Sequence, residues 1–560
     1  MGGDMRKPFT AALLVVVLSL GAFSQSNNAA LGGTVQDVSG AFIPGVTITA
    51  TNTGTGIVTT VISNEAGAYQ FASLQPGTYD VKAALPGFQP AVAKAFQLGG
   101  AQQARFNFAL QVGGGATTVD VNIAADTLLA TSSNSIGTIL PEYKVRDLPL
   151  AVRDVFGLVE RSAGVAPADA NGLIGNFAGG RMSAANTMRD GINVSAGRFE
   201  DGAWSVTYTS PDLVEEVKVV TAPVDAQTAR GNGQVSMVTR SGTNQLHGTA
   251  FWTNHNSALD ANSWFNNFNG VKKNYDNRNQ FGGRVSGPIV KNKTFFMVLF
   301  EGQRDLKREN ATGNTLTPMA RQGIFRYFPG VDNANANNAN PSVDRNGNPV
   351  RPERATGDLA AIDLFGNCTF NGAPVTNCRP YRDPLRPAIS NTAYMQETLR
   401  RMPAPNEFTG GDGLNQATIR FTRRVEGLDS TFGNGPDVDR DQYNARIYHQ
   451  FNTNHKLSVI GTKEKTWGAA TQAVLRSWPQ GFDGQAVKRP DVYIVTFTST
   501  LSSTLLNELR AGRRRSIDQQ FPPANRSGAT AVSGNASSRR ASTVTRRTPS
   551  SRARTTNSQS

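Results

Sequence analysis

Residues 210–266 read SPDLVEEVKVVTAPVDAQTARGNGQVSMVTRSGTNQLHGTAFWTNHNSALDANSWFN, and two kinds of pattern meet in them. Up to Gly242, short apolar runs are separated by turn residues, as in a small compact unit. From Gln245 onward, apolar and polar residues alternate over about ten residues, which is typical of a long strand. The turn Ser241-Gly242-Thr243 stands between the two patterns. We therefore expect a domain boundary at Gly242.

Seven segments after Gly242 show this alternation. In one of them Tyr443 and Ile447 share a face, and Asn444 and Arg446 lie on the other. Segments of about ten residues with one apolar and one polar face are typical of strands that cross an outer membrane. The seven segments are residues 245–254, 279–289, 294–303, 441–451, 456–465, 490–500 and 504–512.

The connections between these segments alternate in length. Residues 290–293, 452–455 and 501–503 are short, whereas 256–278 and 466–489 are long and 304–440 is very long. A membrane barrel has tight periplasmic turns and long outer loops, so this alternation predicts a partial outer-membrane barrel over residues 243–512. The Gly-, Asn- and Asp-rich connection 304–440 is then a long extracellular loop.

The N-terminus carries an export signal. Arg6 and Lys7 precede an apolar run, and Ala22-Phe23-Ser24 offers small residues before a cleavage point. This layout predicts a secretory signal peptide over residues 1–24. In an exported protein, Cys368 and Cys378 are expected to form a local disulfide, because neither has the further ligands nearby that a metal site needs.

Residues 29–112 show short period-two segments separated by turn signals, which favours a small antiparallel β-sandwich. The stretches GTVQDVSGAFIPGVTITATNTGTG (33–56) and GTYDVKAALPGF (77–88) resemble the carboxypeptidase regulatory-like domain, which has a transthyretin-like or Cna-B-like fold. The resemblance implies a sandwich module and not a peptidase. The sequence shows no zinc-binding or nucleophile constellation beside it, so we expect no enzyme activity.

Residues 117–242 predict a mixed α/β unit. Residues 141–149 and 153–159 have helical spacing, and residues 213–217 suggest a short helix that runs into a strand. Asp190-Gly191 favours a tight turn between short strands. Residues 234–240 alternate as another strand.

Three linked stretches carry a second resemblance: GGRMSAANTMRDGIN (179–193), the boundary stretch quoted above, and NQFGGRVSGPIVKNKTFFMVLFEG (279–302). In this order they resemble the plug and first barrel strands of Oar-like TonB-dependent transporters, an architecture that also includes the sandwich domain. The resemblance implies a plug at 117–242, location in the cell outer membrane, contact with its lipid, a TonB-type energy-coupling partner and an extracellular ligand of unknown identity.

The plug loop supplies the candidate ligand site. Arg181, Arg189 and Asp190 offer charges, and Gly179 and Gly180 allow a ligand to approach the backbone closely. An alternative assigns Arg189 and Asp190 to ion pairs with the barrel wall or to capping the turn. We predict no metal site and no cofactor.

The segment after the glycine joint 113–115 is the candidate contact for the energy-coupling protein. Its alternation is typical of an extended strand, and adding a strand to a partner's sheet gives affinity through backbone hydrogen bonds. The alternative is that it forms the first strand of the plug. The segment consists of Thr118, Val119, Asp120, Val121, Asn122 and Ile123.

The net charge of +14 comes mostly from the end of the chain, since residues 511–560 contain ten arginines and one aspartate. We therefore expect no nucleic-acid binding, and residues 513–560 are interpreted as a basic low-complexity tail.

Seven strands do not close a barrel, so we expect a truncated, transport-incompetent form or a fragment. The alternative function is a cell-surface adhesion protein that binds carbohydrate or protein through the sandwich.

The expected fold class is mainly β. It comprises an N-terminal β-sandwich, a mixed α/β plug and the first strands of an incomplete transmembrane β-barrel.

Overall fold

The structure is a computed structural model. It describes residues 28–100, 102–113, 119–121, 136–150, 153–166, 176–180, 185–195, 205–222, 233–268, 270–333, 340–385, 389, 391–425, 427–428, 438–470, 484–502 and 505–521. The expected signal peptide and most of the basic tail lie outside these residues. Within them, no helix combines the length and apolar character that crossing a membrane requires.

The N-terminal domain is a β-sandwich, as expected. One sheet has the order β4-β1-β7, with β8 also paired to β1, and the other has the order β3-β2-β5-β6-β9. Alternate residues of the strands point inward and form one apolar core that includes Phe71 and Phe96. The expected antiparallel pairing is incomplete, because β7 and β8 run parallel to β1. The strands are β1 (Ala29–Asp37), β2 (Thr47–Asn52), β3 (Val58–Ile62), β4 (Ala68–Leu74), β5 (Gly77–Ala84), β6 (Ala91–Leu98), β7 (Gln103–Arg105), β8 (Phe108–Leu110) and β9 (Val119–Val121).

The plug is a mixed α/β unit around a sheet of order β10-β13-β14-β11-β12. Asp190 and Gly191, with φ of 46° and 77°, form the tight turn between β11 and β12 that the sequence predicts. The helix expected at residues 213–217 is wrong: β13 begins at Val214, because its valines bury one face of an extended strand. The elements are β10 (Ile136–Leu140), α2 (Glu142–Asp147), α3 (Phe156–Val159), β11 (Ala185–Arg189), β12 (Ile192–Asn193), β13 (Val214–Ala222) and β14 (Gly233–Thr239).

The wall contains all seven expected strands, paired antiparallel with their neighbours in one curved sheet. Two short strands, β27 (Gly484–Lys488) and β30 (Asp518–Phe521), extend it at the end away from the short turns. The seven are β15 (His247–Asn256), β16 (Tyr275–Val290), β17 (Thr294–Leu316), β25 (Asp439–Gln450), β26 (His455–Ala470), β28 (Asp491–Thr500) and β29 (Leu506–Arg515).

The long connection differs from the expected loop. Strand β17 continues well beyond Arg304 to Leu316, and β23 (Gln416–Val425) returns along it before the chain rejoins the wall. Between them an outer lobe contains the Cys368–Cys378 disulfide, with a Cα–Cα distance of 5.7 Å. The lobe consists of α5 (Pro318–Arg321), β18 (Ile324–Tyr327), β19 (Ala360–Asp363), β20 (Thr369–Phe370), β21 (Ala373–Pro374), β22 (Cys378–Pro380) and α6 (Ala393–Arg401).

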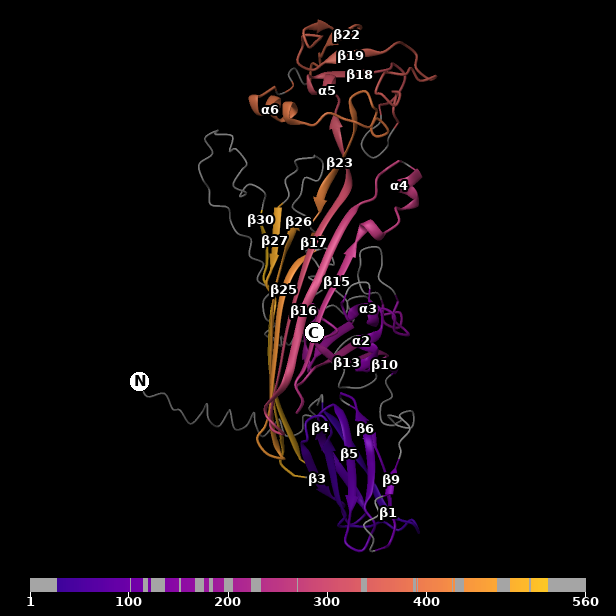
Figure 1. Ribbon diagram of the computed structural model, residues 1–560. Helices are drawn as coiled ribbons and strands as arrows, with labels where there is room; N and C mark the ends of the chain where they lie inside the picture. Colours follow the sequence, from indigo (N-terminus) through magenta and orange to yellow (C-terminus); the bar gives the residue numbers. More distant parts are fainter. Residues whose placement is uncertain are drawn as a thin grey trace, which may run out of the picture.

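Smaller elements complete the outer end: η4 (Ser257–Leu259) and α4 (Trp264–Phe268) between β15 and β16, and β24 (Gly427–Leu428) beside β26. Figure 1 shows the sandwich at one end of the wall, the plug against one face of the wall, and the lobe at the opposite end. The short turns β16–β17 and β25–β26 lie at the sandwich end. The lobe therefore lies at the end of the wall opposite these short turns.

Candidate functional site

The plug meets the wall at the β11–β12 hairpin. Arg189 is fully buried and donates to Thr209 Oγ1 (3.1 Å) in the plug and to Thr462 Oγ1 (3.4 Å) on β26. Asp190 accepts hydrogen bonds from the backbone N–H (3.1 Å) and hydroxyl (2.5 Å) of Thr239, and its carboxylate lies 3.9 Å from Arg446 of the wall. Burial lowers the pKa of Arg189, and the nearby acids Asp190 and Glu464 oppose that effect. The hairpin is thus held by polar contacts on both sides.

A second contact is centred on Tyr208 of the plug. Its ring lies 3.4 Å from the guanidinium carbon of Arg440, a buried cation–π contact. Its backbone N–H donates to Glu464 Oε2 (2.8 Å), and its carbonyl accepts from Gln442 Nε2 (2.7 Å). Its hydroxyl accepts from Gln280 Nε2 (3.1 Å). Four wall residues from three strands, β16, β25 and β26, therefore converge on one plug residue.

A third contact involves the segment before α3. Arg153 forms an ion pair with Asp212, its guanidinium lies 3.9 Å from the Phe251 ring of β15, and Thr249 Oγ1 donates to Asp212 (3.0 Å). The neighbouring Asp154 is buried and accepts from Phe156 N (3.0 Å). Burial raises the pKa of Asp154 from 3.8 to about 7.

Apolar contacts accompany this polar network. The plug core continues into five buried wall side chains, Met297, Leu299, Ile460, Val492 and Ile494. Within the described part of the chain, Arg189 Nε, Arg440 Nε and Glu464 Oε1 are buried without a hydrogen-bond partner. Such atoms cost free energy when buried, so water that enters the interface stabilises the separated state. The arrangement suits a plug that is seated firmly but can be displaced.

The sandwich also contacts the plug and the wall. Asn244 donates to the carbonyls of Gly54 (2.9 Å) and Thr55 (2.6 Å) and exchanges hydrogen bonds with Asn292 in the β16–β17 turn. Gly100 N donates to Glu216 of the plug (3.1 Å), whose pKa is raised to about 7 by burial.

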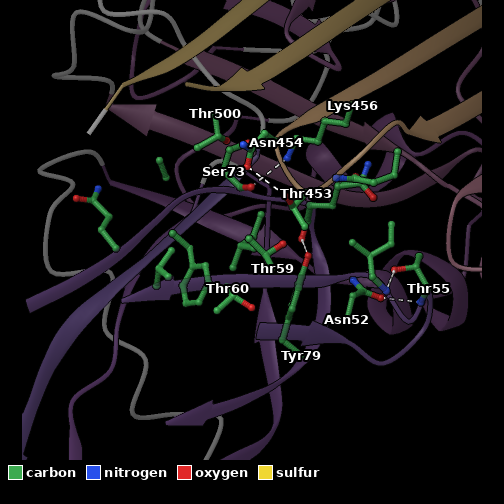
Figure 2. Close-up of a pocket in the computed structure, with 18 of the residues that line it drawn as sticks. Asn52, Thr55, Thr59, Thr60, Ser73, Tyr79, Thr453, Asn454, Lys456 and Thr500 are labelled. Carbon is green, nitrogen blue, oxygen red and sulfur yellow. Dashed lines mark hydrogen bonds between the residues drawn. The ribbon is translucent and has the colours of Figure 1, made fainter. Parts of the chain in front are cut away.

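Figure 2 shows a cavity of about 170 Å³ at the same junction. It lies between Asn52, Thr59, Thr60 and Tyr79 of the sandwich and Asn454 and Thr500 of the wall, and Lys456 Nζ donates to Ser73 O (3.0 Å) beside it. The sandwich is thus docked on the end of the wall that carries the short turns.

The structure places the predicted ligand residues in two locations. Gly179, with φ of 75°, and Gly180 lie in the turn after Phe177, whereas Arg189 and Asp190 are buried against the wall. Arg181 lies outside the described residues. In the described part of the chain, no group of three or more His, Cys, Asp or Glu side chains is placed to hold a metal.

The predicted energy-coupling segment is described only in part. Val119–Val121 form β9, which pairs in parallel with Ala91–Ala93 of β6 at the edge of the sandwich. Thr118, Asn122 and Ile123 lie outside the described residues.

Sequence reasoning missed most of the residues that join plug and wall: Asp154 and Tyr208 of the plug, and Arg440, Gln442 and Glu464 of the wall. A signal was present, because Gln442, Asn444, Thr462 and Glu464 occupy the polar face of their strands. That pattern indicates the inward face of the wall. It does not indicate which plug residue each side chain meets.

Comparison with known proteins agrees with this architecture. Residues 238–560, more than half of the chain, match the family described as "Outer membrane beta barrel domain", and residues 30–111 match "Carboxypeptidase regulatory-like domain". The chain is 27% identical over 294 residues to the TonB-dependent transporter Oar of Myxococcus xanthus. That match covers 50% of this chain and 27% of the relative, so the chain spans about a quarter of the relative's length.

Two solved receptors are similar over 70% of this chain at a TM-score of 0.28, which carries no argument by itself. They are Pseudomonas aeruginosa FpvA bound to heterologous pyoverdines (12% identity, 43% of that chain) and FauA, the alcaligin outer membrane receptor of Bordetella pertussis (10% identity, 49% of that chain). A hydroxyquinol 1,2-dioxygenase of Pseudomonas putida matches 16% of this chain at a TM-score of 0.13 and likewise carries none. From the family match, the chain belongs to the outer membrane beta-barrel domain family, and its location is the cell outer membrane.

Proposed function

We propose that the chain is a receptor and transporter that takes up an extracellular ligand when a TonB-type protein pulls on its periplasmic side. The observation that carries this proposal is the buried polar network between plug and wall. Hydrogen bonds to Arg189 and Tyr208 can be exchanged for hydrogen bonds to water, so separating the surfaces costs less than separating a purely apolar contact of the same area. A plug held in this way can shift and reseat.

The force enters through residues 118–123. Strand β9 pairs with the sandwich sheet and not with the plug sheet, which favours a coupling segment over a first plug strand. As the last strand of its sheet, β9 can add a partner strand through backbone hydrogen bonds. The linker between β9 and β10 then passes the pull to the plug.

The ligand contacts remain those expected from the sequence. Gly179 and Gly180 lie in one plug turn, where they permit close approach, and Arg181 follows them in the sequence. Arg189 and Asp190 are part of the same proposal, but their burial means that they reach a ligand only after the plug has shifted.

The placement of the sandwich favours a transporter over an adhesion protein. The sandwich is docked at Asn292 and Lys456, beside the short periplasmic turns, whereas a surface-binding module would face outward. Here the sandwich holds the coupling strand under the plug.

The coupling strand is tested by capture of the chain with the purified periplasmic domain of a TonB-type protein. Replacing Val119 and Val121 by proline removes two backbone donors and should abolish capture, because strand addition depends on the backbone. Replacing both by alanine keeps those donors and should leave capture intact. Equal capture of the proline and alanine variants would remove residues 118–123 from the proposal.

A further inference from the structure

The cavity between the sandwich and the wall, which we call the junction cavity, is lined by residues of these two domains and by no described residue of the plug. It lies where β3 and β4, the edge strands of the two sandwich sheets, run next to each other and face the wall (Figure 2). The wall contributes the turn that joins β25 to β26 and the end of β28. Small-molecule sites occur preferentially at such domain interfaces, so this cavity of about 170 Å³ is a candidate site.

Part of the junction cavity is lined by the apolar core of the sandwich. Phe71 and Leu74 of β4 belong to that core, Val61 of β3 packs against it, and all three line the cavity. An apolar lining favours the carbon skeleton of a ligand over water, which needs several polar partners. An apolar protein cavity of about 150 Å³ holds benzene, so the junction cavity has room for one aromatic ring.

The charge in the junction cavity is positive. Of the described residues that line it, Lys456 is the one charged residue, and none is an aspartate or a glutamate. Lys456 Nζ donates one hydrogen bond to Ser73 O (3.0 Å), and an ammonium group has three N–H donors. Lys456 also lines the adjoining cavity of about 40 Å³, but there Glu508 pairs with Arg510. A carboxylate on a ligand therefore matches both the charge and the donors of Lys456.

Hydroxyl and amide groups form the rest of the lining, and hydrogen bonds within each domain hold it in place. On the wall, Asn452 Oδ1 accepts from Asn454 N (2.9 Å), and Thr500 N donates to Asn454 O (2.9 Å). On the sandwich, the Tyr79 hydroxyl donates to Gln75 O (2.8 Å). Because each of these bonds lies within one domain, a ligand requires little reorganisation of the lining when it binds.

We propose that the junction cavity binds a small aromatic carboxylate. Its ring lies against the apolar side chains of Phe71 and Leu74, and its carboxylate accepts hydrogen bonds from Lys456 Nζ. The hydroxyls of Thr59 and Thr500 suit a hydroxyl substituent on the ring. Because the lining comes from both domains, the bound ligand joins the sandwich to the wall and stabilises their docking. This site shares no residue with the ligand loop of the plug and is independent of the proposed transport function.

The test is isothermal titration calorimetry of the purified full chain with para-hydroxybenzoate and with para-hydroxybenzamide, which has a similar shape and no charge. The wild-type chain should bind the acid about tenfold more tightly than the amide, because hydrogen bonds between charged groups are the stronger ones. Lys456→Gln should weaken binding of the acid about tenfold and leave binding of the amide unchanged. Equal affinities of the wild-type chain for acid and amide, or no binding of the acid at millimolar concentration, would overturn the site.

The matched control removes the same charge from the opposite face of the same strand. Lys463 of β26 is exposed, whereas its neighbours Thr462 and Glu464 are buried toward the plug. Lys463→Gln should leave the affinity for para-hydroxybenzoate unchanged. An equal loss in the two variants would show a general attraction between a positively charged chain and an anion, and would contradict a site at Lys456.

Hydrogen exchange locates the ligand without any substitution. Saturating para-hydroxybenzoate should slow exchange at the amides of β4 and of residues 452–455, which line the cavity from the sandwich and from the wall. Protection confined to the outer lobe or to the plug would place the ligand elsewhere and overturn the assignment. Because this measurement uses the wild-type chain, it decides between the two outcomes even if Lys456→Gln fails to fold.

Discussion

The sandwich core and the plug–wall interface are both buried, but they are built from different side chains. The sandwich core is a continuous apolar cluster, and its buried polar residues Asn52, Thr55 and Ser63 lie in or beside turns. The plug–wall interface instead buries Arg189, Arg440 and Glu464, among other polar groups. Opening an apolar core exposes its side chains to water and loses the free energy of burial. Opening a polar interface replaces its hydrogen bonds by hydrogen bonds to water, which costs less. The difference separates a contact that maintains a fold from one that can be undone.

The largest effect is expected in the sandwich core. Replacing Phe71 by alanine removes a fully buried ring and should lower the free energy of unfolding of this domain by about 4 kcal/mol. Hydrogen exchange of the β1 and β4 amides in the full chain measures the loss. The control is Val58→Ala, at a position that is 44% exposed. This variant should change the free energy of unfolding of the sandwich by less than about 0.5 kcal/mol. Similar effects of the two variants would contradict the assignment of the core.

A smaller effect is expected from Arg440→Met. The side chain fits the space, but it leaves the buried acids Asp154 and Glu464 without their shared cation, which should weaken plug seating by about 3 kcal/mol. Exchange should accelerate at the amides of β11 and β14 and not in the sandwich. The double variant R440M/E464Q should recover part of the loss, because it also removes a buried charge. If exchange accelerates equally in both domains, the two contacts are not independent.

The third prediction concerns pH. Burial raises the pKa of Asp154 to about 7, so its contribution to plug stability is fully present below about pH 4 and is lost as the pH rises to about 7. Asp154→Asn keeps the oxygen that accepts from Phe156 N and removes the titration. As the pH rises across this range, the melting temperature of the wild type should therefore fall relative to that of the variant. A difference that is constant with pH would exclude Asp154 as the titrating group.

The smallest effect is expected at the sandwich–wall junction. Asn244→Ala removes side-chain hydrogen bonds to Thr55 and Asn292 that are partly exposed to solvent, so docking should weaken by about 1 kcal/mol. Limited proteolysis of the turn at Asn292 should become faster, while exchange in the sandwich core stays constant. Thr243→Ala, at the neighbouring exposed position, is the control. Slower hydrogen exchange in the sandwich core of the Asn244→Ala variant would mean that the junction strains the sandwich.

The sequence predicted much of the fold because alternation with period two fixes the faces of a strand. The seven wall strands, the sandwich and the Asp190-Gly191 turn all follow from it. It failed at residues 213–217, where apolar spacing fits a helix or a strand and only the buried sheet decides. It also failed at the outer connection, because the polar residues beyond Arg304 continue β17 as far as Leu316.

For the candidate site the sequence identified the plug side of one contact, at the β11–β12 hairpin. Arg189 and Asp190 were singled out for their charge, and their pairing with the wall was an open alternative. The structure places both residues against β25 and β26, more than 250 positions away in the chain. No sequence pattern identifies Tyr208. Glu464 and Gln442 bind its backbone N–H and carbonyl, which residues of other types also have.

The sequence by itself thus determined the kinds of domain, their order and the face that each strand turns to the membrane, because these depend on local periodicity. The tertiary structure alone decided that Tyr208 lies against Arg440 and that β9 joins the edge of the sandwich. Those contacts depend on sheet curvature and on the register between distant strands, which no local pattern encodes.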